Sequence, residues 1–192
     1  MLGPKIQIVS RKFINPSNPT PKHLQSFKLS VFDRLAPASH IKIVLYFSNN
    51  EEHKAENNYQ RQLSELEESL AHTLSKFYPL TGRLVKDQEQ LFIDCSDQGA
   101  EYLETKVDKE LAEFLHQGVK DGSLDQLLPQ EVGAADSATS PLLTIQTNLF
   151  DCGGLALGVC VSHKVADTST VVSFINEWAK SNQGEINNKT WE

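Results

Sequence analysis

The sequence predicts an α/β fold of the layered α+β kind, with a mixed, largely antiparallel sheet and flanking helices. Short stretches of apolar residues alternate with period two, as in strands, and two longer stretches repeat apolar residues at helical spacing. Hairpin-like turns join several of the strands, which favours antiparallel pairing. The chain has 192 residues and is 39% hydrophobic, enough for one sizeable domain or two small ones.

The first part of the chain predicts two strands and one long helix. We expect strands over Ile6–Ile14 and over Ile41–Phe47, where β-forming residues alternate with polar ones. A proline-rich loop over 15–21 separates the first strand from residues of mixed character, and 48–58 is polar enough to be a loop. An apolar stripe from Tyr59 to Phe77 then predicts a helix, which Pro79 ends.

The middle of the chain predicts a hairpin, a short strand, a short helix and a loop. Residues 83–85 and 90–95 flank a polar turn and form the hairpin. A strand is expected over Ala100–Thr105 and a helix over Leu111–Leu115. The stretch 121–140 is rich in Gly, Asp, Ser and Pro, which indicates a long loop.

The rest of the chain is organised around the stretch Gly154–Trp178. Up to Ser162, bulky apolar residues alternate with small ones, which predicts a strand with one core face and one face that another group can approach. The strand over 143–149 and the turn over 150–154 make it the return leg of an antiparallel hairpin. A helix is expected from Thr168 to about Ala179, so His163 lies where a buried strand turns into a helix.

His163 and Asp167 are the candidate catalytic residues. An imidazole with an ordinary pKa near 6.5 is mostly neutral at pH 7 and can accept a proton from an alcohol or amine. A histidine with a purely structural role at a strand end is an equal alternative. Asp167 either orients the imidazole or caps the following helix through the backbone N–H of Ser169 or Thr170, and capping is favoured.

No protein nucleophile is indicated beside His163. Ser162 is its neighbour, but adjacent side chains on an extended backbone point to opposite faces. Cys152 and Cys160 lack an activating partner in the sequence. We find no glycine-rich phosphate loop, H-E-x-x-H metal motif or G-x-S-x-G motif. If the chain performs acyl chemistry, direct transfer is therefore expected.

Composition excludes several classes of partner. A net charge of −7 and a pI near 5.4 argue against a nucleic-acid surface. No apolar stretch is long enough to span a membrane, and residues 1–14 lack the apolar core of a signal peptide. The three cysteines fit neither a disulfide framework nor a zinc site, so reduced thiols and a cytoplasmic location are expected, with no bound metal.

Several segments together resemble the plant BAHD acyltransferases, in particular their alkaloid-acetylating branch. Each is weak alone, but their order and spacing cover nearly the whole chain. The matching segments are Pro16–Pro21, Leu29–Asp33, Phe77–Leu84, Phe150–Gly154, Ser162–Asp167 and Phe174–Ala179.

The resemblance implies an acyltransferase that moves an acyl group from acyl-CoA to a plant specialised metabolite. The expected acyl group is acetyl, and the expected acceptor is a hydroxyl, with an amine as the less expected alternative. Acyl-CoA is then a co-substrate, and no permanently bound cofactor is implied. His163 would be the general base. Asp167 would point away from the site and hold the loop through an arginine elsewhere. The fold would be one of the two chloramphenicol-acetyltransferase-like domains between which the family's substrate channel runs.

Two departures from the family pattern shape this hypothesis. Thr168 stands where the family often has glycine. The chain is also less than half the family's length and lacks the D-F-G-W-G motif. Residues 1–192 are therefore expected to be the N-terminal domain, which needs a C-terminal acyltransferase domain in cis or in trans. The alternative is a truncated, non-catalytic paralogue that binds a ligand or a partner protein. Peptide-synthetase condensation domains share the His-x-x-x-Asp logic, but they usually carry a second histidine where Ser162 stands.

Overall fold

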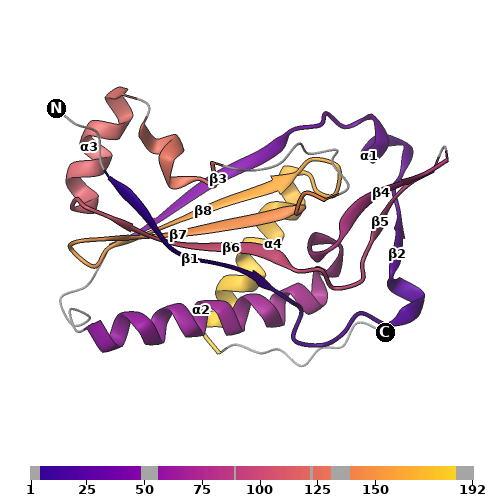
Figure 1. The fold of residues 1–192 in the computed structure, drawn as a ribbon, viewed down its shortest axis with the longest axis horizontal. Coiled ribbons are helices and arrows are strands. Elements are labelled where there is room, and N and C mark those ends of the chain that lie inside the picture. Colours follow the sequence, from indigo (N-terminus) through magenta and orange to yellow (C-terminus); the bar gives the residue numbers. More distant parts are fainter. Residues whose placement is uncertain (1–4, 49–55, 89, 122, 131–138, 185–192) are drawn as a thin grey trace.

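The computed structural model describes residues 5–48, 56–88, 90–121, 123–130 and 139–184. Its main element is a five-stranded sheet with strand order β1-β6-β7-β8-β3 (Figure 1). Neighbouring strands are antiparallel except for the parallel pair β6–β7. The predicted mixed, largely antiparallel sheet is thus confirmed. The strands are β1 (Ile6–Ile14), β3 (His40–Phe47), β6 (Ala100–Val107), β7 (Leu143–Phe150) and β8 (Leu155–Ser162).

Strands β7 and β8 form the predicted antiparallel hairpin. Its register runs from Leu143 opposite Val161 to Leu149 opposite Leu155. Gly153 in the connecting turn has φ 80°, a backbone conformation that glycine adopts without a steric penalty. On its other side β8 pairs with β3. Because β8 lies between two strands, its backbone and the position of its last residues are held on both edges.

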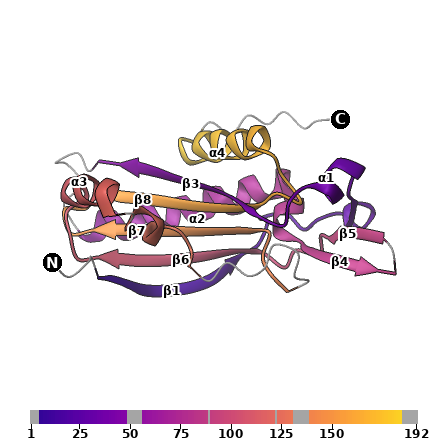
Figure 2. The same cartoon turned by 90° about the horizontal axis from the view of Figure 1, so that it is seen from above.

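Two helices cover one face of the main sheet. They are α2 (Glu56–Lys76) and α4 (Thr168–Asn182), which Figure 1 and Figure 2 show from two sides. The Trp178 Nε1–H of α4 donates to the carbonyl of Leu66 and the hydroxyl of Ser69 on α2. The core between helices and sheet contains the bulky side of β8, as the alternation predicts; its buried members include Leu70, Leu74, Tyr102, Ile145, Leu157, Val159, Val161, Phe174 and Trp178.

The opposite face is partly covered by α3 (Leu111–Asp121) and a short 3-10 helix (Ser123–Leu127). A Cβ added at Gly158 of β8 would lie 2.2 Å from the carbonyl oxygen of Leu127. The small-residue face of β8 therefore admits a close backbone approach, as its alternation with small residues predicts. This second core comprises Val107, Leu111, Phe114, Leu127, Phe150 and Ala156.

A smaller three-stranded sheet adjoins the main one, with strand order β2-β5-β4. It confirms the predicted hairpin, because β4 (Arg83–Asp87) and β5 (Gln90–Asp94) pair antiparallel. Strand β2 (Ser26–Lys28) and the short helix α1 (Val31–Leu35) were not expected as separate elements. A capping box starts α1: the Asp33 N–H donates to the Ser30 hydroxyl, and the Ser30 N–H donates to the Asp33 carboxylate. The Ser-x-x-Asp pattern was visible in the sequence.

The boundaries of three elements differ most from expectation. Helix α2 begins at Glu56, inside the expected loop 48–58; of that stretch, 49–55 lie outside the described residues. Helix α3 continues to Asp121, well beyond Leu115. The 3-10 helix occupies part of the expected loop 121–140, of which 131–138 are not described. Strong local patterns thus located the elements, while their ends depended on packing. None of the described helices is both long and apolar enough to cross a membrane.

Candidate active site

His163 follows the last residue of β8 and opens the turn that leads to α4. Its backbone N–H donates to the carbonyl of Ser39 at 2.9 Å, which continues the β3–β8 ladder by one step. The turn is closed by the carbonyl of Ser162, which accepts from the N–H groups of Val165 and Ala166. The side chain of His163 is half-buried. The imidazole is thus attached to a rigid backbone while part of its surface stays accessible.

Lys164 attaches the short helix α1 beside this turn. Its side chain is buried, and Nζ donates to the carbonyls of Arg34 at 3.0 Å and Ala36 at 2.6 Å. These carbonyls lie at the C-terminal end of α1, where a cation is favourable. Phe32 and Leu35 of the same helix are 83% and 77% exposed. A short helix with apolar exposed side chains therefore lies next to the His163 turn.

Asp167 is the N-cap of α4, which confirms the favoured structural alternative. Its Oδ1 accepts from the backbone N–H and from the hydroxyl of Thr170, both at 2.7 Å. These two hydrogen bonds, the backbone one foremost, lower the pKa of the Asp167 carboxyl below its usual range. The carboxylate is exposed, and no arginine pairs with it among the described residues. The structure thus brings Asp167 to the helix and not to the imidazole.

The side chains nearest to His163 in sequence offer no activated nucleophile. The Ser162 side chain is buried and its Oγ accepts from the N–H of Lys164 at 3.2 Å. Burial raises the pKa of the Cys160 thiol to about 11, although Lys42 opposes the shift. The sulfur of Cys152 accepts from the N–H of Leu111 at the far end of β8. The Cys160 thiol is therefore protonated at neutral pH, and Cys152 lies far from His163.

His40 is a neighbour of the site that the sequence did not single out. It is the first residue of β3 and lies opposite Ser162. Its Nε2 is buried and has no hydrogen-bond partner within the described part of the chain. Burial, then the charge of Lys42, then that of His163 lower the pKa of His40. The pairing of β3 with β8 sets His40 opposite the residue before His163, and no local sequence motif predicts that pairing.

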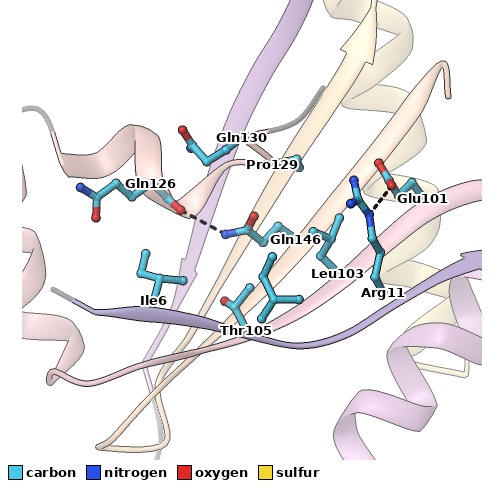
Figure 3. Close-up of a pocket in the computed structure, with 10 residues that line it drawn as sticks. Ile6, Arg11, Glu101, Leu103, Thr105, Gln126, Pro129, Gln130 and Gln146 are labelled. Atoms are coloured by element: carbon cyan, nitrogen blue, oxygen red, sulfur yellow. Dashed lines mark hydrogen bonds and ion pairs between the residues drawn. The ribbon is translucent and has the colours of Figure 1, made fainter. Parts of the chain in front are cut away.

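A pocket of about 320 Å³ lies elsewhere, on the β1–β6–β7 part of the sheet (Figure 3). Gln146 projects into it and donates to the carbonyl of Gln126 at 3.1 Å, and an Arg11–Glu101 ion pair of 2.7 Å closes one side. Neither His163 nor Asp167 lines this pocket. The sequence-predicted site and this cavity are therefore separate features. Among the described residues, no cluster of His, Cys, Asp and Glu could hold a metal ion.

Fold and sequence together place the chain in a known class of enzymes. The model of the Transferase family matches residues 4–191, so the chain belongs to this family, the BAHD acyltransferases.

Its curated relatives include plant O-acetyltransferases. Salutaridinol 7-O-acetyltransferase of Papaver somniferum is 36% identical over 94% of this chain, and limonoid 21-O-acetyltransferase of Melia azedarach is 38% identical over 90% of it. The chain spans 38% and 39% of their lengths. It therefore corresponds to about two fifths of each relative.

Solved structures support the fold. Vinorine synthase is 32% identical and superposes with a TM-score of 0.80 over 95% of this chain, which covers 44% of that enzyme. F. sporotrichioides TRI101, solved with coenzyme A and T-2, has a TM-score of 0.64 over 87% of this chain and 40% of its own, at 17% identity. The second match shows the fold alone. The vinorine synthase match agrees with the predicted branch of the family, and its coverage corresponds to a single domain of the family fold.

Proposed function

We propose that residues 1–192 are the N-terminal domain of an acyl-CoA-dependent O-acyltransferase that acetylates a hydroxyl of a plant specialised metabolite. The observation that carries the proposal is the placement of His163: a half-buried imidazole at the end of a strand held on both edges, in a chain whose relatives are O-acetyltransferases. An amine acceptor is the less favoured variant. The three described cysteines are free, which supports a cytoplasmic location.

In the proposed reaction His163 acts as general base. It takes the proton of the acceptor hydroxyl as the oxygen attacks the thioester carbonyl of acetyl-CoA. The new C–O bond forms, the C–S bond breaks, and the proton passes from the imidazole to the departing thiolate. The products are the acetyl ester and free coenzyme A. The proposed transfer has no acyl-enzyme intermediate, because the Ser162 hydroxyl and the Cys160 thiol are both buried.

Asp167 is proposed as a positioning residue. Its capping bonds to Thr170 fix the start of α4 and thereby the length of the turn that begins with His163. Its exposed carboxylate is free to meet an arginine of a second, C-terminal domain, supplied in cis or in trans. That domain would also supply the other wall of the channel, because reacting geometry requires both substrates to be held.

The experiment is an assay of free thiol released from acetyl-CoA in the presence of plant alcohols. The chain is tested alone and with a separately expressed C-terminal domain of vinorine synthase. We expect turnover by the chain alone or together with the second domain. His163→Ala should lower the rate of turnover about 10²- to 10⁴-fold. His116→Ala, an exposed histidine on α3, is the matched control and should retain full activity. A folded chain without turnover in either mixture would contradict the enzyme and favour a binding module.

A further inference from the structure

The pocket on the β1–β6–β7 part of the sheet is large enough to hold a small molecule (Figure 3). Its volume of about 320 Å³ lies at the lower end of the range of about 300–1,000 Å³ that small-molecule sites occupy. A molecule of one or two rings fits such a volume, whereas coenzyme A is too large for it. Since neither His163 nor Asp167 lines the pocket, the proposed reaction gives it no role.

Gln146 of β7 offers a buried hydrogen-bond acceptor to this pocket. It is 4% exposed, and its Nε2 donates to the carbonyl of Gln126 at 3.1 Å and to Oδ1 of Asn148 at 2.7 Å. A backbone carbonyl can only accept, so the amide nitrogen must face Gln126 and the amide oxygen must point away from it, as Figure 3 shows. Within the described ranges of the chain, no hydrogen bond reaches that oxygen. Oε1 of Gln146 can therefore accept from a donor that enters the pocket.

A buried polar network holds this acceptor in place. Asn148 is fully buried, and its Nδ2 donates to the carbonyls of Leu127 at 2.9 Å and Ala156 at 3.1 Å. Its Oδ1 also accepts from the hydroxyl of Thr105, another residue that lines the pocket, at 2.8 Å. The Gln146 amide cannot turn without breaking hydrogen bonds of this network. The pocket thus presents a preorganised acceptor, which lowers the entropic cost of binding a ligand.

The rest of the lining favours a neutral and partly apolar ligand. Its charged residues, Arg11 and Glu101, pair with each other at 2.7 Å, so neither needs a counter-ion from a ligand. The apolar wall extends from buried residues to an exposed one, and a flat ring can pack against it. This wall comprises Ile6, Ile8, Leu103 and Pro129.

We propose that this pocket is a second binding site, separate from His163, for a neutral phenol or a similar ring compound whose O–H or N–H donates to Oε1 of Gln146. The ring of the ligand packs against the apolar wall. A molecule of the same shape that can only accept leaves Oε1 unpaired, and a carboxylate brings a second negative charge beside Glu101. The inference does not depend on the proposed acyl transfer, because no step of that reaction uses a residue of this pocket.

The test compares three probes of similar shape. 2-Naphthol carries an O–H donor, 2-methoxynaphthalene can only accept, and 2-naphthoate is an anion at pH 7. Each is titrated into the isotope-labelled chain while the side-chain amide of Gln146 and the ring of His163 are followed by NMR. We expect 2-naphthol to shift Gln146 with a Kd below about 1 mM. The other two probes should bind at least about 5- to 10-fold more weakly, the equivalent of one neutral hydrogen bond.

Three variants locate the bound probe. Ile8 lines the pocket and is 57% exposed, so Ile8→Trp can fill the opening without disturbing the core, and binding of 2-naphthol should be lost. Val9→Trp is the matched control and should keep the wild-type Kd, because Val9 is 54% exposed on the same strand and does not line the pocket. Gln146→Leu should weaken 2-naphthol to the level of 2-methoxynaphthalene. If this buried substitution impairs folding, Ile8→Trp still decides the location.

Each outcome decides the proposal. A Kd for 2-naphthol that is unchanged in Ile8→Trp overturns it, and so does equal affinity for 2-naphthol and 2-methoxynaphthalene. It is also overturned if 2-naphthol shifts His163 alone and His163→Ala abolishes binding, because the probe then occupies the proposed catalytic site. The absence of any shift at Gln146 with about 1 mM 2-naphthol overturns it too. None of these results bears on the acyltransferase, which the release of thiol tests separately.

Discussion

His163 and Asp167 are close in sequence but act on different neighbours. The N–H of His163 extends the β3–β8 ladder, whereas the carboxylate of Asp167 caps α4. The capped helix and the paired strand together determine the path of the turn between them. The spacing of the two residues thus reflects the length of a turn with a defined start and end, and a direct contact between imidazole and carboxylate is not required.

The role of Asp167 can be divided by two substitutions. Asp167→Ala removes the cap and should lower the midpoint of urea unfolding, by less than the core substitution discussed below; Asp167→Asn retains a capping oxygen and should be nearly neutral. If an arginine pairs with the carboxylate, both variants should lose acyl-transfer activity, with a smaller loss than in His163→Ala. Equal activity in Asp167→Asn and wild type would confine Asp167 to capping. Because the folded pKa is lowered, the part of this difference that comes from the negative charge should be present above about pH 4 and be lost as the pH falls through the folded value, while the part that Asn also supplies should remain.

At the scale of elements, β8 combines two requirements in one alternating pattern. Leu157, Val159 and Val161 fill the core under α2 and α4. On the opposite face, Gly158 lets the backbone of Leu127 approach the sheet. The layer formed by α3 and the 3-10 helix therefore depends on the absence of a side chain at this position.

The substitution Gly158→Ala tests that dependence. The new Cβ would meet the Leu127 carbonyl, a backbone atom that a rotamer change cannot move, so we expect a loss of about 1–3 kcal/mol in the free energy of unfolding. Gly154→Ala is the control in the same hairpin, because the atoms nearest to its new Cβ belong to the side chains of Leu111 and Cys152 and lie at 3.0–3.3 Å. Urea unfolding measures both. Equal effects of the two variants would show that the Leu127 segment shifts without penalty.

The same elements show how far sequence could go. Alternation and helical spacing located β1, β3, α2, β7, β8 and α4, since each has one face that must be buried. The His163 turn followed from the junction of β8 and α4, which is local information. The parallel β6–β7 pairing and the placement of β3 beside β8 are long-range, and no short motif encodes them. His40 was therefore not identified from the sequence. The Ser30–Asp33 capping box that starts α1 is local and could have been identified, because its pattern is visible in the sequence.

For the molecule as a whole, one charge cluster connects the helix layer to the sheet. Lys12 of β1 donates to Glu67 of α2 at 2.6 Å and pairs with Glu104 of β6 at 2.8 Å. In a chain with net charge −7, one ammonium group thus faces two carboxylates, which leaves one negative charge uncompensated when both are ionised. Burial raises the pKa of Glu67, and the charge of Glu104 adds to the shift against the opposing effect of Lys12. Burial is the largest single effect on Glu104 and acts to raise its pKa, but the hydrogen bond with Lys12, the charge of Lys12 and the other hydrogen bonds to the carboxylate together outweigh burial, and the net pKa is lowered.

These opposite shifts predict opposite effects of neutralising the two residues. Glu104, with a lowered pKa, stabilises the fold above its unfolded pKa near 4.3, and this contribution disappears as the pH falls through the folded value. Glu67, with a raised pKa, stabilises the protonated fold, and this contribution disappears as the pH rises through its folded value. At pH 7 we therefore expect Glu104→Gln to lower the free energy of unfolding and Glu67→Gln to raise it, each by less than about 1 kcal/mol because the groups are partly exposed.

Urea unfolding between pH 3.5 and 8 measures both variants. The control is Glu68→Gln, an exposed neighbour on α2 that should change neither the stability nor its pH dependence. Loss of stability at pH 7 in both Glu67→Gln and Glu104→Gln would mean that Lys12 needs two charged partners to hold α2 against the sheet.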